Sequence, residues 1–217
     1  MQEIKANVTT PPTMGSVFGE IDPTDINMPK LNIVQGVGRL SEGFNPGQIV
    51  YDGEIALSDG ATPIEFTILS ARKQYIENLV YGAEARPRVF NTLSEVWSAG
   101  GTIEWHAGKR PSYVPVLHVM VLFKVPQCVE IPFSMEYKGE HYRLAVWTLR
   151  GMVYNKAGKK ILIESMYGLP EGPHYGKWRL STKREKVGHN SIFVPVIRCE
   201  ERHCDDFVKF VTSLTNL

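Results

Sequence analysis

The stretch YGKWRLSTKREKVGHNSIFVPVIR, residues 175–198, has the pattern of a β-hairpin with two unlike arms. Its first arm carries five Lys or Arg residues, whereas its second arm is almost purely apolar. Because successive side chains of a strand point to opposite faces, one face of the first arm presents Lys177, Arg179 and Lys183. The other face turns Trp178 toward the core. The hairpin therefore predicts a sheet with one buried face and one basic face.

Residues 142–154 give the same division when they are taken as one strand. Trp147 falls on the inner face, while Tyr142, Arg150 and Tyr154 share the outer one. The turn NKAGKK that follows adds three further cations at one end, which are Lys156, Lys159 and Lys160. If the two segments are neighbours in one sheet, its solvent face is a basic patch interleaved with tyrosine.

Most of the remaining chain has the signals of β-strands, which are short apolar runs closed by Gly, Asp or Pro. The clearest runs are LNIVQGVG, GQIVYDGEIAL, TPIEFTILSA, SYVPVLHVMVLFKV, KKILIESMYG and SIFVPVIR. The last run is apolar on both faces, so we expect a neighbouring strand on each side of it. The segment SARKQYIENLVYG fits a helix or a strand. Residues 1–30 lack periodicity and are expected to form an extended arm.

Two short helices have clear signals. In NTLSEVWSAGG, Thr92 and Glu95 form a capping box and Gly100 supplies a left-handed stop. We expect Trp97 to pack from this helix onto the body. The C-terminal segment CDDFVKFVTSLTNL has four apolar residues at helical spacing, beginning at Phe207, behind an acidic start.

The positive charge is concentrated in one part of the chain. The whole sequence has a net charge of +1, but residues 137–186 hold 11 Lys+Arg against 4 Asp+Glu, a net of +7. Residues 1–100 hold 7 against 12, a net of −5. A local excess of this kind is typical of proteins that bind polyanions.

The sequence has no apolar run long enough to span a membrane and no apolar signal segment near its start. Its three cysteines, Cys128, Cys199 and Cys204, are too few for a disulfide framework. We therefore expect a protein of the cytoplasm, with no membrane partner.

The sequence does not match the catalytic and cofactor-binding motifs compared with it. GMVYNKAGKK lacks the glycine spacing of a phosphate loop, and the hydrolase signatures are absent. His118 lies within an apolar run and is expected to be a core histidine. In CEERHC, the spacing of Cys199, His203 and Cys204 is unlike that of common zinc modules, with Cys128 as a candidate fourth ligand. We expect no enzyme activity, no cofactor and no bound metal.

The order of five segments resembles tailed-phage proteins of the replication and recombination region, a group similar to OB-fold single-stranded DNA-binding proteins. These segments are PKLNIVQG, FNPGQIVYDGE, VLHVMVLFKVP, AVWTLRGMVYNKAGKKI and GKWRLSTKREKVGHNSIFVPVI. The resemblance covers most of residues 29–198 and implies an OB-like barrel that binds single-stranded DNA, in the host cytoplasm if a phage encodes the protein. One departure is the C-terminus, which has a neutral helical pattern in place of an acidic tail.

Together these observations predict a mainly β protein. We expect an OB-like antiparallel barrel with added strands and two or three short helices, formed as one domain by residues 31–217. The expected function is sequence-tolerant binding of single-stranded DNA in phage-type replication or recombination, by cations on phosphates and rings on bases. The expected contacts are Tyr142, Arg150, Tyr154, Lys156, Lys159, Lys160, Lys177, Arg179 and Lys183. Trp147 and Trp178 are assigned to the core.

One alternative remains open at this point. A phage capsid or tail protein would also combine a β domain with an extended N-terminal arm, and Lys and Arg on an exposed strand also protect a sheet edge from aggregation. Replication or recombination proteins are further candidate partners, and a homo-oligomer is compatible with the sequence.

Overall fold

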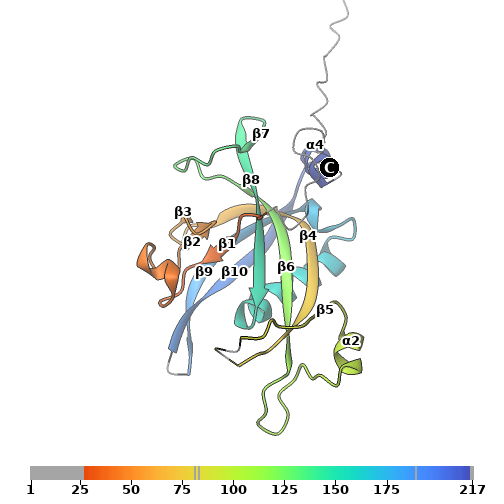
Figure 1. The fold of residues 1–217 in the computed structure, drawn as a ribbon. Coiled ribbons are helices and arrows are strands. Elements are labelled where there is room, and N and C mark those ends of the chain that lie inside the picture. The colour runs from red at the N-terminus through yellow and green to blue at the C-terminus, as the bar shows by residue number, and fades with distance from the viewer. Residues whose placement is uncertain (1–26, 81, 83, 189, 216–217) are drawn as a thin grey trace, which may run out of the picture.

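The computed structural model describes residues 27–80, 82, 84–188 and 190–215 (Figure 1). The predicted arm, residues 1–30, lies outside this part of the chain except for its last four residues. The elements in chain order are β1 (Leu31–Ile33), η1 (Arg39–Glu42), β2 (Ile49–Tyr51), β3 (Ile55–Ser58), β4 (Ile64–Glu77), β5 (Val89–Phe90), α2 (Leu93–Ser98), β6 (Tyr113–Lys124), β7 (Met135–Tyr137), β8 (Glu140–Arg150), η2 (Tyr154–Gly158), α3 (Lys159–Ile163), η3 (Glu164–Gly168), η4 (Pro173–Tyr175), β9 (Gly176–Val187), β10 (Asn190–Arg202) and α4 (Asp205–Thr215). The prediction of a mainly β fold is confirmed.

The strands form two antiparallel sheets. The larger has the order β10-β9-β4-β6-β8-β7, with β5 paired to the far end of β4, and the smaller has the order β1-β2-β3. The sheets meet where Val146 N–H of β8 donates to Pro29 O (2.8 Å) and where the Gln35 amide makes two hydrogen bonds to the backbone of Phe193 in β10. No described strand pair closes a barrel, so the OB-like barrel stays a prediction.

The apolar core lies on the inner face of the larger sheet. Trp178 and Leu180 of β9 are fully buried there, and Trp147 of β8 is 2% exposed. Both tryptophan rings contact Phe66 of β4, with ring centroids 6.1 and 6.2 Å apart. The inward assignment of these two tryptophans from strand parity is therefore confirmed.

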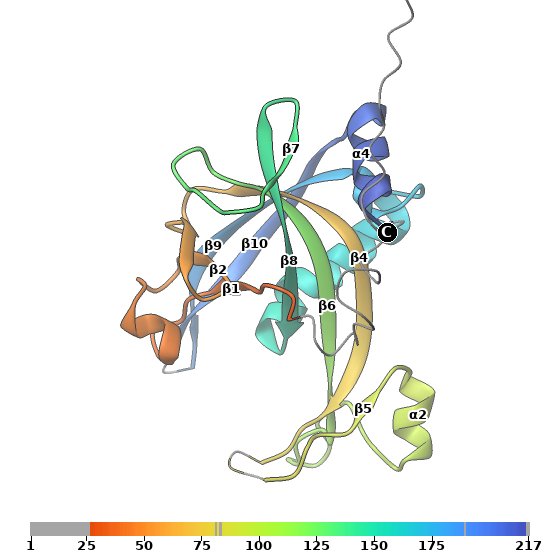
Figure 2. The ribbon, with the colours of Figure 1, turned by 45° about the horizontal axis from the view of Figure 1, so that its top comes forward.

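The segment from Tyr154 to Gly168 is helical, so the strands predicted for 142–154 and for KKILIESMYG are wrong beyond Arg150. Gly151 adopts a left-handed φ of 59°, which ends β8 and turns the chain. Buried apolar residues then recur at helical spacing, at Tyr154, Ala157 and Ile161. Figure 2 shows this segment, in teal and cyan, on one side of β8, β6 and β4.

Strand β10 is an edge strand of the larger sheet, so the prediction of a neighbour on each side of it is wrong. Its free edge is covered by other means. The Gln35 side chain binds Phe193, Pro195 has no N–H to offer, and Lys160 Nζ donates to Ile197 O (2.9 Å). Val194 and Ile197 point to opposite faces of β10 and are both buried, so its apolar sequence does not require a further strand.

Both predicted helices are present. Thr92 Oγ1 accepts from Glu95 N–H (3.2 Å) and a Glu95 carboxylate oxygen accepts from Thr92 N–H (3.2 Å), which confirms the capping box of α2. At the C-terminus, α4 packs Phe207 and Val211 against Leu122 of β6. The helices lie at opposite ends of the long strands in both views (Figures 1 and 2).

Candidate nucleic-acid interface

The β9 strip, defined as Lys177, Arg179 and Lys183, lies on the outer face of the sheet. Each of these cations has a carboxylate partner from β4, β9 or β10. The pairs, with their N–O distances, are Lys177–Glu65 (2.9 Å), Arg179–Glu200 (3.0 Å) and Lys183–Glu185 (2.8 Å). Such exposed pairs add little to stability, but they cancel most of the positive potential that the sequence of β9 suggests. Nucleic-acid contact by this strip stays a prediction.

The predicted contacts around NKAGKK divide among three roles. Tyr154 is 5% exposed and belongs to the core, so its expected place on an outer strand face is wrong. Lys156 pairs with Glu185 (2.9 Å), and Lys160 covers the β10 edge. Lys159 is exposed and has no carboxylate partner among the described residues. The segment therefore offers Lys159 as its one unpaired cation within the described chain.

Tyr142 lies on the predicted face of β8 but under α4. Its ring centroid is 5.3 Å from that of Phe207 and 6.2 Å from that of Phe210. Burial raises the pKa of the Tyr142 hydroxyl to about 12. A pocket of about 280 Å³ between α4 and the sheet is lined by Tyr142, Lys177 and His203. Because α4 covers the ring, Tyr142 is not open for stacking in this conformation.

Arg150 belongs to a polar surface on the half of the outer face that α4 leaves open. We name this surface the central patch, and its members come from β4, β6, β8 and the residue before the α2 cap. They are Arg72, Gln74, Asn91, His118, Thr148 and Arg150. Among the described residues, no carboxylate lies within ion-pair distance of either arginine.

The strand register brings the central patch together. Arg72 of β4 is paired with His118 of β6, which is paired with Thr148 of β8. His118 Nδ1 lies 3.2 Å from Thr148 Oγ1, and Arg72 Nη2 donates to Asn91 Oδ1 (2.9 Å). Arg150 follows two residues after Thr148, on the same face of β8. Two uncompensated guanidinium groups thus stand on one open strand face.

His118 is not the core histidine that its apolar neighbours indicate. It lies on the outer face, partly exposed, where burial and then the charge of Arg72 lower its pKa below the usual value of 6.5. The ring is therefore neutral at pH 7. It can accept or donate one hydrogen bond at each nitrogen, according to tautomer, and it adds no charge to the two arginines.

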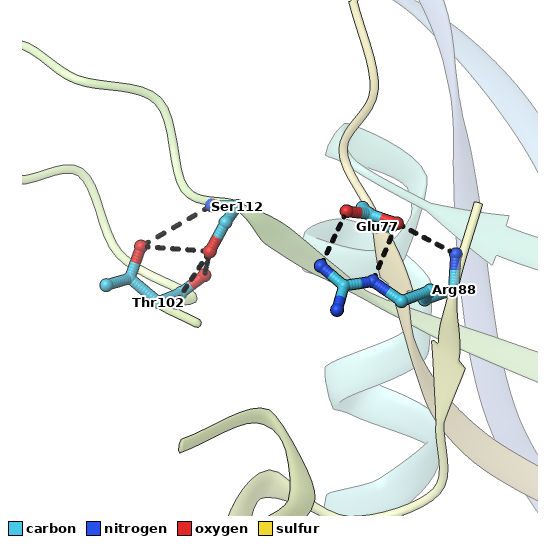
Figure 3. A network of polar contacts seen from close by, with 4 residues as sticks. All are labelled: Glu77, Arg88, Thr102 and Ser112. Atoms are coloured by element: carbon cyan, nitrogen blue, oxygen red, sulfur yellow. Dashed lines mark hydrogen bonds and ion pairs between the residues drawn. The ribbon is translucent and has the colours of Figure 1, made fainter. Parts of the chain in front are cut away.

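Beyond the body, the ends of β4, β5 and β6 carry a projection, here called the α2 arm, which ends in α2 and the loop before β6 (Figure 1). Figure 3 shows two hydrogen-bonded residue pairs of the α2 arm, Glu77 with Arg88 and Thr102 with Ser112. The Arg88 guanidinium makes two hydrogen bonds to the Glu77 carboxylate (3.0 and 3.2 Å), and these hold the pKa of that carboxyl below its usual value. Thr102 N–H donates to Ser112 Oγ (2.7 Å), which ties the two ends of the loop together.

Two tryptophans of the α2 arm are exposed, and the sequence analysis did not predict their exposure. Trp97 of α2 is 62% exposed, so its expected packing on the body is wrong, and Trp105 of the loop is 67% exposed. The six-residue helix fully buries Val96 alone. The rings line a groove of about 420 Å³ together with Leu93 and Ile103. The one sequence signal for an exposed tryptophan was the place of Trp105 in the polar, glycine-containing loop EWHAGKRP.

Comparison with protein-family models, with curated proteins and with solved structures gives no match. No group of three or more His, Cys, Asp or Glu side chains in the described part of the chain is placed to hold a metal ion. Across residues 27–80, 82, 84–188 and 190–215, no helix has the length and apolar character needed to cross a membrane. Functional inference therefore depends on the chemistry of the surfaces described above.

Proposed function

We propose that this protein binds single-stranded DNA without catalysing a reaction, in a role such as phage-type replication or recombination. The observation that supports this most is the central patch, where Arg72 and Arg150 lie on one open face without carboxylate partners among the described residues. A guanidinium group binds phosphate oxygens through a fork of N–H donors. The neighbouring Thr148, Gln74 and Asn91 add neutral groups that can bind sugar or phosphate.

The size of the central patch favours a single strand. It crosses three neighbouring strands, so it is about 10 Å wide, which suits a few nucleotides. Contacts of this kind neutralise phosphates and read no base sequence, so we expect little sequence preference.

The proposal gives the β9 strip a smaller share of the binding. To bind phosphate, Arg179 must give up its ion pair with Glu200, and Lys183 must give up its ion pair with Glu185. The exchange of one anion for another adds little net attraction. The central patch has no such carboxylate to displace among the described residues.

A salt-dependent titration with poly-dT and with duplex DNA tests the proposal. Each phosphate contact with a single strand contributes about −0.7 to the log-log slope of affinity against salt, so the two arginines of the central patch give a slope of about −1.4, and any further phosphate contact makes it steeper. We expect that slope with poly-dT and weaker binding to the duplex. A flat salt response would overturn the proposal.

A second candidate, a phage capsid or tail component, is favoured by apolar side chains exposed on one helical segment. Ile163, Met166 and Tyr167 follow one another at helical spacing and are 57, 68 and 80% exposed. Such a strip suits contact with another protein chain. Light scattering of the protein alone and with an oligonucleotide separates the two candidates, because an assembly protein forms larger oligomers as its concentration rises without DNA and does not bind the oligonucleotide.

A further inference from the structure

We infer that the tryptophan groove, formed by Trp97, Trp105, Leu93 and Ile103, is a stacking site for unpaired nucleobases. The inference rests on the proposed binding of single-stranded DNA and adds a second subsite outside the sheet. Its first support is the unusual exposure of both rings in one groove of about 420 Å³. The other two tryptophans, Trp147 and Trp178, are buried in the core.

The groove is held in shape by its surroundings. The capping box fixes the start of α2, and the bond from Thr102 N–H to Ser112 Oγ closes the loop that carries Trp105. A Cβ on Gly101 would lie 2.6 Å from the ring of Tyr113, so the loop backbone packs directly on that ring. A preorganised aromatic surface loses less conformational freedom on binding than a mobile one.

The chemistry of the rim favours an anionic chain with aromatic groups. Lys109 and Arg110 follow Trp105 in the same loop, are exposed, and have no carboxylate partner among the described residues. Glu104 is the one carboxylate of the groove lining, which also includes His106. Every base has a π-face that stacks on tryptophan, and Lys109, whose backbone pairs with that of His106 in the groove lining, is a nearby cation for a neighbouring phosphate.

Asn91 connects the central patch to the start of α2. Asn91 accepts hydrogen bonds from Arg72 (2.9 Å) and Gln74 (3.0 Å), and it directly precedes Thr92, the cap of α2. The helix that presents Trp97 therefore begins at the patch. To reach the groove from Arg72, a DNA strand must pass around the edge of the sheet at Asn91, because Val96 of α2 packs on Tyr75, which faces opposite to Arg72 along β4.

The test uses the full chain and two probes of equal length, oligo-dT and an abasic oligodeoxyribose phosphate. We expect oligo-dT to bind at least tenfold more tightly than the abasic probe and to quench the fluorescence of the exposed tryptophans. The double variant Trp97→Ala with Trp105→Ala should lose about tenfold in affinity for oligo-dT and keep its affinity for the abasic probe. Tyr167→Ala removes an even more exposed ring elsewhere (80%) and should bind as the wild type does.

A conservative variant separates stacking from a folding defect. Trp97→Phe with Trp105→Phe keeps two rings and should retain affinity for oligo-dT within about threefold, and thermal melting should show all variants folded. Salt-dependent binding of both probes with equal affinity would leave the proposed function standing and overturn the groove assignment. A change of oligomeric state in the Ala variant, without loss of oligo-dT affinity, would overturn it in favour of a protein interface.

Discussion

The β9 strip and the central patch lie on the same outer face, yet their positive charges differ in what surrounds them. Arg179 in the strip has Glu200 at 3.0 Å, whereas Arg72 in the patch donates to the neutral amide oxygen of Asn91 at 2.9 Å. The number of cations in a strand therefore does not give the charge that a ligand meets. The neighbouring side chains on the same strand and on adjacent strands decide it.

The largest expected effect separates the buried tryptophan of β9 from an exposed tryptophan of α2. Trp178→Ala should lower the free energy of unfolding by roughly 3 to 5 kcal/mol, because the ring is fully buried against Phe66. Trp97→Ala is the matched control, and its cost should stay within about 0.5 kcal/mol because that ring is exposed. Denaturant titration measures both. Equal stability of the two variants would contradict the face assignment.

A second effect tests the half of the outer face that α4 covers. Burial, and then the charge of Lys177, lower the pKa of His203 to about 4, with Glu65 opposing the shift. The unfolded chain has a His pKa near 6.5, so between pH 6.5 and 4 it binds more protons than the folded protein. The contribution of His203 to stability is therefore complete above pH 6.5 and is lost as the pH falls toward 4. Because the ring is partly solvated, the loss should be about 2 kcal/mol.

Other groups titrate over the same range, so the variant His203→Gln isolates this contribution. Its side chain retains a polar group near Thr67, whose Oγ1 lies 2.7 Å from His203 Nε2. The stability difference between the wild type and this variant should shrink by about 2 kcal/mol from pH 7 to pH 4. A difference independent of pH would show that His203 does not titrate with a lowered pKa.

The smallest expected effect is a gain in DNA affinity when cations of the β9 strip lose their carboxylate partners. Glu200→Gln and Glu185→Gln remove the carboxylates that pair with Arg179 and Lys183, without a large change of shape. The freed cations should raise the affinity for poly-dT about threefold and steepen its salt slope by up to about 0.7 for each phosphate that they newly bind. Asp59→Asn, in the loop after β3, removes one negative charge away from the strip and should have no such effect. Unchanged affinity in the first variant would show that ion pairing does not limit the strip.

Local sequence signals predicted several elements correctly. Alternation placed Trp178 and Leu180 in the core, because the two faces of β9 differ clearly in polarity. The pair Thr92 and Glu95 located the start of α2, since a capping box is a local motif. Helical spacing of Phe207 and Val211 likewise located α4.

The features that were missed depend on long-range packing. The β-branched residues of KKILIESMYG favour a strand, yet the sheet buries Ile161 through helical turns. The carboxylates opposite the β9 strip come partly from β4 and β10, and parity within one strand does not reveal them. Of the predicted contacts, Arg150 alone belongs to the central patch. The sequence did not reveal the patch because other members, such as Arg72 and His118, lie on strands that are distant in sequence.

The most direct test of the account compares two double variants that remove the same charge. We predict that Arg72→Ser with Arg150→Ser lowers the affinity for poly-dT at least tenfold at moderate salt and reduces the salt slope by about 1.4, the value for two lost phosphate contacts. Arg179→Ser with Lys183→Ser should lower it less than threefold, because both cations already have carboxylate partners. An equal or larger loss in the second variant, or no loss in the first, would contradict the assignment of DNA binding to the central patch.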